Sequence, residues 1–410
     1  MRKVFMIVIF GIIVGLGWCL RGFDLDRPHG YMFDEIYHVP TFKLIARGDI
    51  RAYQWWHSEL KEEFPPGAYV EWLHPPLAKL IQAVFFNLGD NRYYIWRLPS
   101  AIIGTILIVV VAALARAIFP QQPLTWLLAA LLAAIDGLAV AMSRIAMNDI
   151  FVTTFSALAI LFYWYYYHRP QQTRWLWAMA ISVGLACASK WSGFWLFPFI
   201  GFWEILRWKI WQTTNKKKAV ALVVFTAGIA ACVYLTSYGQ MFYLGGSLRH
   251  FLALHNQIID YQFYLNATHP YASRAWQWPL GLRPVYLYLD SEQNDRAYWN
   301  TPFYPSWYLA LGCLVAEILI VIADFYQEVW RRRQTQVASK TVRRFFTDYE
   351  SQLFLLLGYF ALWTPWIFSP RIMYFHHYLP ALPCLWVLAS GTICKLLDKP
   401  IKNDTKINKA

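Results

Sequence analysis

The chain has 410 residues, of which 58% are hydrophobic, 19% aromatic and only 15% charged. A soluble protein of this length could not bury so many apolar side chains in its own core, so the composition excludes a soluble fold and indicates a membrane protein with several spans. The formal net charge of +13 does not indicate nucleic-acid binding, because the basic residues occur in blocks between apolar runs, as they do in cytoplasmic loops.

The first apolar run covers residues 4–20. It is longer than the core of a usual signal peptide and no small-residue cleavage pattern follows it, so we expect a first transmembrane helix rather than a cleaved signal. A polar loop rich in Trp, Tyr and Pro then covers residues 21–96. Two amphipathic stretches in this loop, 37–46 and 76–88, are expected to lie flat on the bilayer surface.

Nine further apolar runs follow, so the sequence predicts ten membrane spans. These runs are 98–118, 124–140, 150–167, 175–188, 194–211, 219–238, 304–324, 353–368 and 374–397. The two runs beside Lys190 are short, because crossing the hydrocarbon takes about 20 residues. With a cytoplasmic N-terminus, every block of Lys and Arg falls inside. We expect one transmembrane domain over residues 1–397, with outer loops at 21–96 and 239–301, and a cytoplasmic tail at 398–410.

The same topology brings the unusual polar residues to the outer face. They are the acids of the first loop, Arg144 with Asp149, Lys190, the polar residues of the loop 239–301, and Arg371. Ionisable groups at several helix ends on one side are hard to explain by packing, so this face is the predicted site.

Two adjacent carboxylates, Asp34 and Glu35, stand in the first outer loop. A carboxylate held where water is partly excluded is able to accept a proton. The alternative is that the pair merely opens a short surface helix, with Asp34 near its N-cap.

Basic residues at the ends of other spans have both functional and structural interpretations. Lys190 lies between two apolar runs, where a lysine needs an anion, and a lipid phosphate at the membrane surface fits that need. Arg97 begins a span and by itself resembles an interface residue. Asp136 and Arg144 bracket an outer turn, where a structural ion pair is an equal alternative.

The two outer loops contain further motifs. A stiff Pro-Pro turn separates His74 from Lys79, and it either aims a helix N-terminus at a polar site or simply makes a rigid corner. Aromatic and polar residues of the second loop form either an interfacial belt or a recognition surface; they include His269, Tyr271, Trp276 and Arg283. The tripeptide that begins at Asn266 fits the N-glycosylation pattern. No cysteine lies in a long polar loop and no cluster has metal-ligand spacing, so we predict neither disulfides nor a metal site, although a cation at Asp34 and Glu35 is compatible with the pattern.

The order of these motifs resembles that of the protein O-mannosyltransferase family. The matching segments are 34–35, 74–79, 97–105, 136–149, 190–193, 269–285 and 376–380. The resemblance spans nearly the whole chain. Ala78 stands where the family usually has Gly, Asn148 stands where Leu is frequent, and there is no soluble MIR domain. The chain is therefore similar to a short prokaryotic member.

The resemblance implies an all-α integral membrane glycosyltransferase of the GT-C fold, with about 10 to 11 transmembrane helices. It implies inverting transfer of mannose from polyprenyl-phosphate-mannose to Ser or Thr hydroxyls on the extracytoplasmic face, without a required cofactor. The implied partners are the lipid donor, an acceptor polypeptide, membrane lipids and, as a further candidate, the translocation machinery.

Asp34 matches the family's catalytic carboxylate, and Glu35 would orient the acceptor or the base. An Asp with a pKa of about 3.9 is ionised at neutral pH, and partial burial is expected to make it a stronger base. Lys190 would hold the donor phosphate. Its expected helpers are Arg144, Arg371, His74 and Lys79, and the expected acceptor or sugar contacts are Asp149, His269, Tyr271, Trp276, Arg283 and His376.

Two other classes of protein compete with this interpretation. A lipid-A sugar transferase would share the fold and the early carboxylate, but that family tends to read KPP where this chain has His74-Pro75-Pro76, and the segment 269–285 favours a protein acceptor. A transporter would place charges near the middle of the membrane and show an internal repeat, whereas here the charges lie at helix ends and no repeat is evident.

Overall fold

The computed structural model describes residues 2–57, 60, 63–89, 92–265, 267–335 and 339–397. The predicted tail 398–410 and Asn266 of the glycosylation pattern lie outside these ranges.

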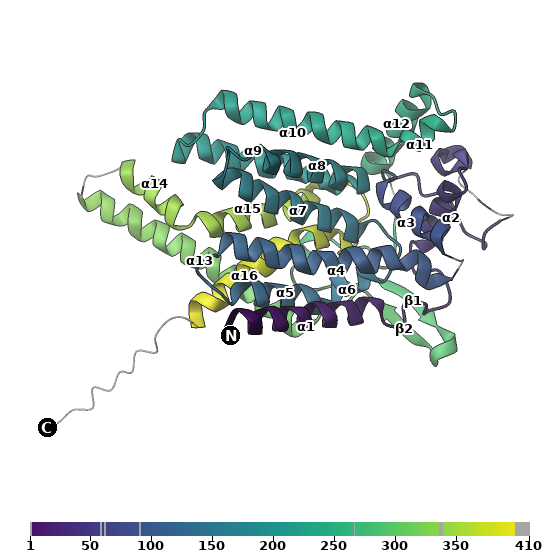
Figure 1. The fold of residues 1–410 in the computed structure, drawn as a ribbon, viewed down its shortest axis with the longest axis horizontal. Coiled ribbons are helices and arrows are strands. Elements are labelled where there is room, and N and C mark those ends of the chain that lie inside the picture. Colours follow the sequence, from purple (N-terminus) through teal and green to yellow (C-terminus); the bar gives the residue numbers. More distant parts are fainter. Residues whose placement is uncertain are drawn as a thin grey trace.

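The protein is a bundle of long helices that run roughly parallel to one another (Figure 1). The helices of the bundle are α1 (Arg2–Gly22), α4 (Tyr93–Ile118), α5 (Thr125–Ile135), α6 (Gly137–Ser143), α7 (Asp149–His168), α8 (Thr173–Ser189), α9 (Leu196–Leu206), α10 (Lys216–Ser237), α13 (Tyr304–Thr335), α15 (Glu350–Trp363) and α16 (Leu382–Leu397). The centre of the bundle contains α4, α7 and α16, whose apolar side chains are mostly buried, while α1, α10 and α13 expose apolar faces at its outside. Such faces suit contact with lipid.

The ten apolar runs that were predicted as spans all correspond to helices of the bundle. Within the described residues, seven helices are long and apolar enough to cross a membrane, and the bent pair α5 and α6 makes an eighth. The two predicted spans beside Lys190 correspond to α8 and α9, which have only 17 and 11 residues. Helix α8 packs between α7 and α10 (Figure 1), and α9 contacts α10 and α15. Both keep some apolar side chains exposed, among them Ile181 and Phe202. The protein is nevertheless a multi-pass membrane protein.

Shorter elements gather at one end of the bundle, opposite the N-terminus and α14 (Ser339–Asp348) (Figure 1). They are α2 (Glu35–Ala46), α3 (Leu77–Leu88), α11 (Gly239–Tyr243), α12 (Leu248–Tyr264) and an antiparallel hairpin of β1 (Tyr286–Asp290) and β2 (Arg296–Trp299). We call this part of the molecule the loop end. It is built from the two loops that the sequence predicts on one side of the membrane.

Helix α2 is not the surface helix that its sequence pattern predicted. Nine of its twelve residues are buried, because it is apolar on most sides and α3 packs against it. Helix α3 fits the prediction better, since Lys79 and Gln82 are buried on one face while Val84 and Leu88 are exposed on the other.

Candidate active site

The two neighbouring carboxylates of the first loop have different environments. The Glu35 side chain is fully buried, and its two oxygens accept hydrogen bonds of 3.0 and 2.8 Å from the Arg97 guanidinium. The same oxygens also accept the backbone N–H groups of Met32 and Ala146, both at 2.9 Å. These four hydrogen bonds join α2, α4 and the turn before α7. Glu35 is therefore not placed to contact an acceptor.

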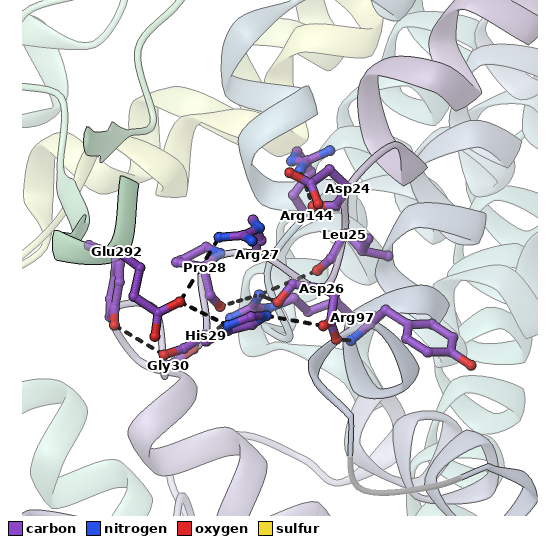
Figure 2. Close-up of polar contacts among 12 residues, drawn as sticks. Asp24, Leu25, Asp26, Arg27, Pro28, His29, Gly30, Arg97, Arg144 and Glu292 are labelled. Atoms are coloured by element: carbon purple, nitrogen blue, oxygen red, sulfur yellow. Dashed lines mark hydrogen bonds and ion pairs between the residues drawn. The ribbon is translucent and has the colours of Figure 1, made fainter. Parts of the chain in front are cut away.

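Arg97 also fixes the loop that leads from α1 to α2. Its guanidinium donates to the backbone oxygens of Leu25, Pro28 and Gly30 at 3.3, 3.0 and 2.7 Å. Figure 2 shows this loop wrapped around Arg97, with Arg144 above it. Arg144 donates to the oxygens of residues 20, 21, 23 and 24, at distances between 2.8 and 3.3 Å. Arg144 is thus a loop anchor and forms no ion pair with Asp136, which instead caps α6 through the Ala139 N–H.

Replacement of Arg97 by Met is expected to lower the free energy of unfolding by about 3–5 kcal/mol, because Glu35 would be left as a buried charge without its partner. Denaturant unfolding of the purified protein in detergent measures this. Removing both charges in Arg97→Met/Glu35→Gln should restore much of the loss. The control is Arg344→Met. The ion pair of Arg344 with Asp348 is mostly exposed, so its loss should change the free energy of unfolding little. Equal stability of the Arg97 and Arg344 variants would contradict the structural role.

Asp34, in contrast, occupies the N-cap position of α2 without capping it. Its side chain accepts no hydrogen bond from the helix, and no other described residue donates one to it. The preceding residue, Phe33, has a φ of +45°, a conformation that is rare for an aromatic residue. A 2.8 Å bond from the Phe33 N–H to the Leu287 oxygen holds it there, and its ring lies edge-on to those of Tyr374 and His376. This anchoring presents an unused carboxylate to the adjacent cavity.

The cavity beside Asp34 has a volume of about 420 Å³ and is lined by residues from five separate parts of the chain. We call it the Asp34 pocket. Among the residues predicted for the site, it brings together Asp34, His74, Lys190, His269, Arg371 and His376. These residues come from the first loop, the turn after α8, the second loop and the turn between α15 and α16. The predicted convergence on one face therefore holds for these six residues.

Two cations stand in the pocket wall. The Lys190 amine donates to one Asp149 oxygen at 2.8 Å, and the second Asp149 oxygen is buried with no partner among the described residues. Arg371 lies 3.0 Å from Nε2 of His377. A guanidinium can only donate, so Nε2 must accept and the proton is on Nδ1. Burial lowers the pKa of Arg371, but a guanidinium remains charged at neutral pH.

Several buried polar atoms around the pocket have no partner within the described part of the chain. They are Nε of Arg371 and the Nδ1 atoms of His38, His74 and His376. Burial and nearby positive charges hold the pKa values of His38 and His74 well below the usual range, so both imidazoles are neutral at neutral pH. Nε of Arg371 is a donor, and Nδ1 of a neutral imidazole is a donor in one of its two tautomers. Buried donors without partners are costly, and a group with several anionic oxygens, such as a phosphate, suits a wall of this kind.

The acidity of Asp34 departs from the sequence-based expectation. Burial is the largest cause and raises its pKa to about 7, while the charges of Lys190 and Arg371 act in the opposite direction and those of Asp149 and Glu71 add to the increase. The expectation of an ordinary pKa, with Asp34 fully ionised at neutral pH, was wrong because the pocket excludes more water than the loop sequence suggests. A carboxyl that titrates near 7 suits proton transfer at neutral pH.

Other predicted site residues lie outside the pocket lining. The Lys79 amine forms a short ion pair with Glu71 and donates to the oxygens of Glu71 and His74, at 2.7 and 3.0 Å. All three of its N–H donors are used, so it shapes the loop beneath His74. Arg283 donates to the Pro270 oxygen at 3.0 Å, and Tyr271 stacks on Tyr286 of the hairpin. Trp276 is half exposed in a short turn.

The pocket also contains residues that the sequence analysis did not select, namely Tyr37, His38, Tyr69, Tyr261, Tyr374 and His377. Helical spacing places His38 on the same face of α2 as Asp34, four positions later, and this signal was available. His377 and Tyr374 lie one and two positions from His376, which the sequence analysis did select. Tyr261 had no signal, because one tyrosine in α12 resembles any other interfacial aromatic.

The chain is similar to protein mannosyltransferases over most of its length. A family model described as dolichyl-phosphate-mannose-protein mannosyltransferase matches residues 73–248, and the C-terminal four-transmembrane region of protein O-mannosyltransferase matches residues 247–409. The polyprenol-phosphate-mannose–protein mannosyltransferase of Mycolicibacterium smegmatis is 25% identical, over 96% of this chain and 82% of its own. That of Mycobacterium tuberculosis is 24% identical, over 90% and 76%.

Solved structures with the same fold are glycosyltransferases. The Saccharomyces cerevisiae Pmt1–Pmt2 complex bound to the sugar donor has a TM-score of 0.76 at 14% identity, covering 97% of this chain and 86% of that one. ArnT of Cupriavidus metallidurans has a TM-score of 0.60 at 15% identity, covering 96% and 60%. The fold is therefore that of the integral-membrane GT-C glycosyltransferases. Within that class, the chain belongs to the protein O-mannosyltransferase family.

Proposed function

We propose that this protein transfers mannose from polyprenyl-phosphate-mannose to Ser or Thr hydroxyls of polypeptides on the extracytoplasmic side of the membrane. The observation that carries the proposal is an unbonded Asp34 carboxylate in one pocket with Lys190 and Arg371. The related mycobacterial proteins are named for this donor and for protein acceptors. Because exported polypeptides are the acceptors, the proposal includes the translocation machinery as a partner.

The reaction needs one proton acceptor and one anion site. A hydroxyl oxygen of the acceptor forms a bond to the anomeric carbon while the bond from that carbon to the phosphate oxygen breaks. Asp34 takes the hydroxyl proton as the new bond forms, since a neutral hydroxyl is a weak nucleophile. The polyprenyl phosphate leaves with the electron pair of the broken bond. Lys190 and Arg371 stabilise the charge that develops on it and no acid is required.

Other residues of the pocket have supporting roles in this proposal. Asp149 holds the Lys190 amine through the 2.8 Å bond. His74 and His376 have unpartnered ring nitrogens at the wall, where they contact donor oxygens, and His269 packs beside Phe33 and Tyr374. Glu35, Lys79, Arg144 and Arg283 keep the loops in place, as their hydrogen bonds indicate.

A lipid or glycan acceptor is the main alternative. The test is transfer of labelled mannose by the purified protein, with a Thr-containing peptide and a lipid-A-type glycolipid offered separately. Peptide labelling that disappears when Thr is replaced by Val supports the proposal. Labelling of the glycolipid alone would assign the protein to the other acceptor class, and uptake of free sugar into vesicles without transfer would identify a transporter.

The proposed topology places the N-terminus and α14 in the cytoplasm and the loop end outside. A membrane-impermeant thiol reagent should label Ser291→Cys in intact cells but label Lys217→Cys only after the cells are opened, because both positions are exposed in the structure. The positive charges around Lys217 are the physical reason for this orientation. The opposite labelling pattern would put the Asp34 pocket in the cytoplasm.

The pH dependence of the reaction should report Asp34. Its pKa is raised to about 7, and only the ionised form accepts a proton. The logarithm of kcat/KM is therefore expected to rise with unit slope as the pH approaches 7 and to become level above it. The donor phosphodiester stays anionic over this range and adds no titration. A profile that remains flat down to about pH 5 would mean that the base has an ordinary carboxyl pKa.

A further inference from the structure

A second cavity, of about 880 Å³, lies on the other side of α2 from the Asp34 pocket. Lys43 and Arg47 face this cavity, whereas Asp34, Tyr37 and His38 line the first one. With 3.6 residues per turn, these two sets fall on opposite faces of the helix. We call the second cavity the Lys43 cavity. The reaction described above gives it no role.

The amine of an almost fully buried side chain lies in the wall of the Lys43 cavity. The Lys43 side chain is only 5% exposed, and its nitrogen lies 4.3 Å from the ring centre of Trp96, 5.6 Å from Phe86 and 5.9 Å from Tyr31. Aromatic faces stabilise a cation, but they leave its N–H donors without acceptors. No described residue accepts a hydrogen bond from this amine. Burial, together with the charge of Arg47, lowers the Lys43 pKa to about 8, so the amine remains mostly protonated at neutral pH.

A second donor in the same wall is also unpartnered. Trp96 is 2% exposed, and its indole N–H has no partner in the described part of the chain. A buried donor without an acceptor costs free energy, and a buried cation costs more unless an anion joins it. The Lys43 amine borders the cavity without an acceptor of its own, so a ligand with an anionic oxygen suits this site.

The mouth of the Lys43 cavity is polar and reaches water. Its rim includes Arg47 and Glu63, whose side chains are 54% and 40% exposed. Glu63 accepts bonds of 3.0 Å from Arg47 and 2.8 Å from Arg51, so its negative charge is matched and does not repel an anion. A rim of exposed ion pairs favours a ligand that arrives from the aqueous side over the headgroup of a lipid in the bilayer.

We propose that the Lys43 cavity is an acceptor subsite that binds an Asp or Glu side chain of the polypeptide whose hydroxyl is glycosylated at Asp34. This inference rests on the proposed function and names a feature of its acceptors. One chain segment connects the two sites, since Glu63 to Pro65 line the Lys43 cavity and Tyr69 to Glu71 line the Asp34 pocket. A polypeptide that lies along this segment reaches both.

The length of α2 sets the spacing between hydroxyl and carboxylate. Nine residues separate Asp34 from Lys43, about 13 Å along the helix axis at about 1.5 Å per residue. Crossing to the opposite face adds the width of the helix, and an extended polypeptide advances about 3.3 Å per residue. The carboxylate is therefore expected about four to six residues from the glycosylated Ser or Thr.

The experiment uses the purified full-length protein, polyprenyl-phosphate-mannose and peptides with a single Thr. One Glu is placed at each position up to eight residues on either side, and each peptide has a Gln counterpart. At the matching spacing, Glu should lower KM by about tenfold or more relative to Gln, as for a hydrogen bond between charged groups. Lys43→Met should abolish this difference and leave kcat for the Gln peptide unchanged. Lys43→Arg should keep part of it.

Lys209→Met is the matched control, because Lys209 also lies over an aromatic ring, at 3.9 Å from that of Trp208, but far from both sites in sequence and outside their linings. It should keep the full preference for Glu. Equal KM values for Glu and Gln peptides at every position of the wild-type protein would overturn the inference, while transfer to the Gln peptides would still support the proposed function. A Lys43→Met effect that depends on anionic phospholipid, and not on the peptide, would overturn it in favour of a lipid site.

Discussion

Replacing Asp34 by Asn is expected to lower the rate of mannosyl transfer at saturating donor by about 10²- to 10⁴-fold, the usual contribution of a general base. The amide has nearly the size of the carboxyl but cannot accept the hydroxyl proton. Because the Asp34 side chain makes no hydrogen bond to the described residues, its replacement should leave the fold intact. Donor affinity and thermal unfolding, measured on the same preparation, should be close to those of the wild-type protein.

Glu35→Gln is the matched control, since it makes the same chemical change one residue away. Its carboxylate holds Arg97 and is not part of the lining of the Asp34 pocket or the Lys43 cavity. The variant should lose stability, while its folded fraction keeps more activity than Asp34→Asn. If Asp34→Asn retained more than about a tenth of the activity, below the usual range for a base, the proton acceptor would have to be sought at Asp149 or Glu71.

The second large effect is expected at Lys190. Lys190→Ala should weaken donor binding and also lower turnover, because the same amine contacts the bound phosphate and the leaving group. Loss of one preorganised donor to a developing anion costs about 10²- to 10³-fold in rate. Titration of the protein with the lipid donor gives the affinity, and single-turnover transfer gives the rate. Lys217→Ala, on the proposed cytoplasmic side, should change neither.

The Lys190–Asp149 bond allows a sharper test. In Lys190→Ala the buried Asp149 carboxylate would be left without its cation and would repel the donor phosphate. Adding Asp149→Asn to Lys190→Ala should therefore restore part of the donor affinity. An unchanged affinity in Lys190→Ala itself would reduce this lysine to an interface anchor.

The sequence predicted the fold class and the gathering of polar residues at one end of the bundle, because both depend on coarse patterns. Apolar runs and blocks of basic residues define the bundle and its sides, and six predicted residues do meet in the Asp34 pocket. All ten predicted apolar runs correspond to helices of the bundle, although α8 and α9 are shorter than an isolated span needs. Helix α2 was misjudged because α3 covers it, and a single stretch of sequence does not report such packing.

The roles of individual charged residues were harder to predict. Asp34 and Glu35 are chemically alike, and only the position of Arg97, 62 residues beyond Glu35, decides which of them is free. Lys79 lies in the first turn of α3 and Lys190 in the turn after α8, yet all three donors of Lys79 are already used by Glu71 and the His74 oxygen. Long-range partners of this kind are fixed by the fold, so motif spacing alone could not separate anchors from site residues.

The measurement that tests the central claim most directly is the anomeric configuration of the mannosylated peptide, determined by NMR against that of the donor. A single displacement with Asp34 as base predicts that the configuration is inverted, because the hydroxyl attacks from the side opposite the departing phosphate. Retention would contradict the account, since it requires two displacements through a covalent glycosyl-enzyme intermediate and would make a carboxylate the nucleophile instead of the base.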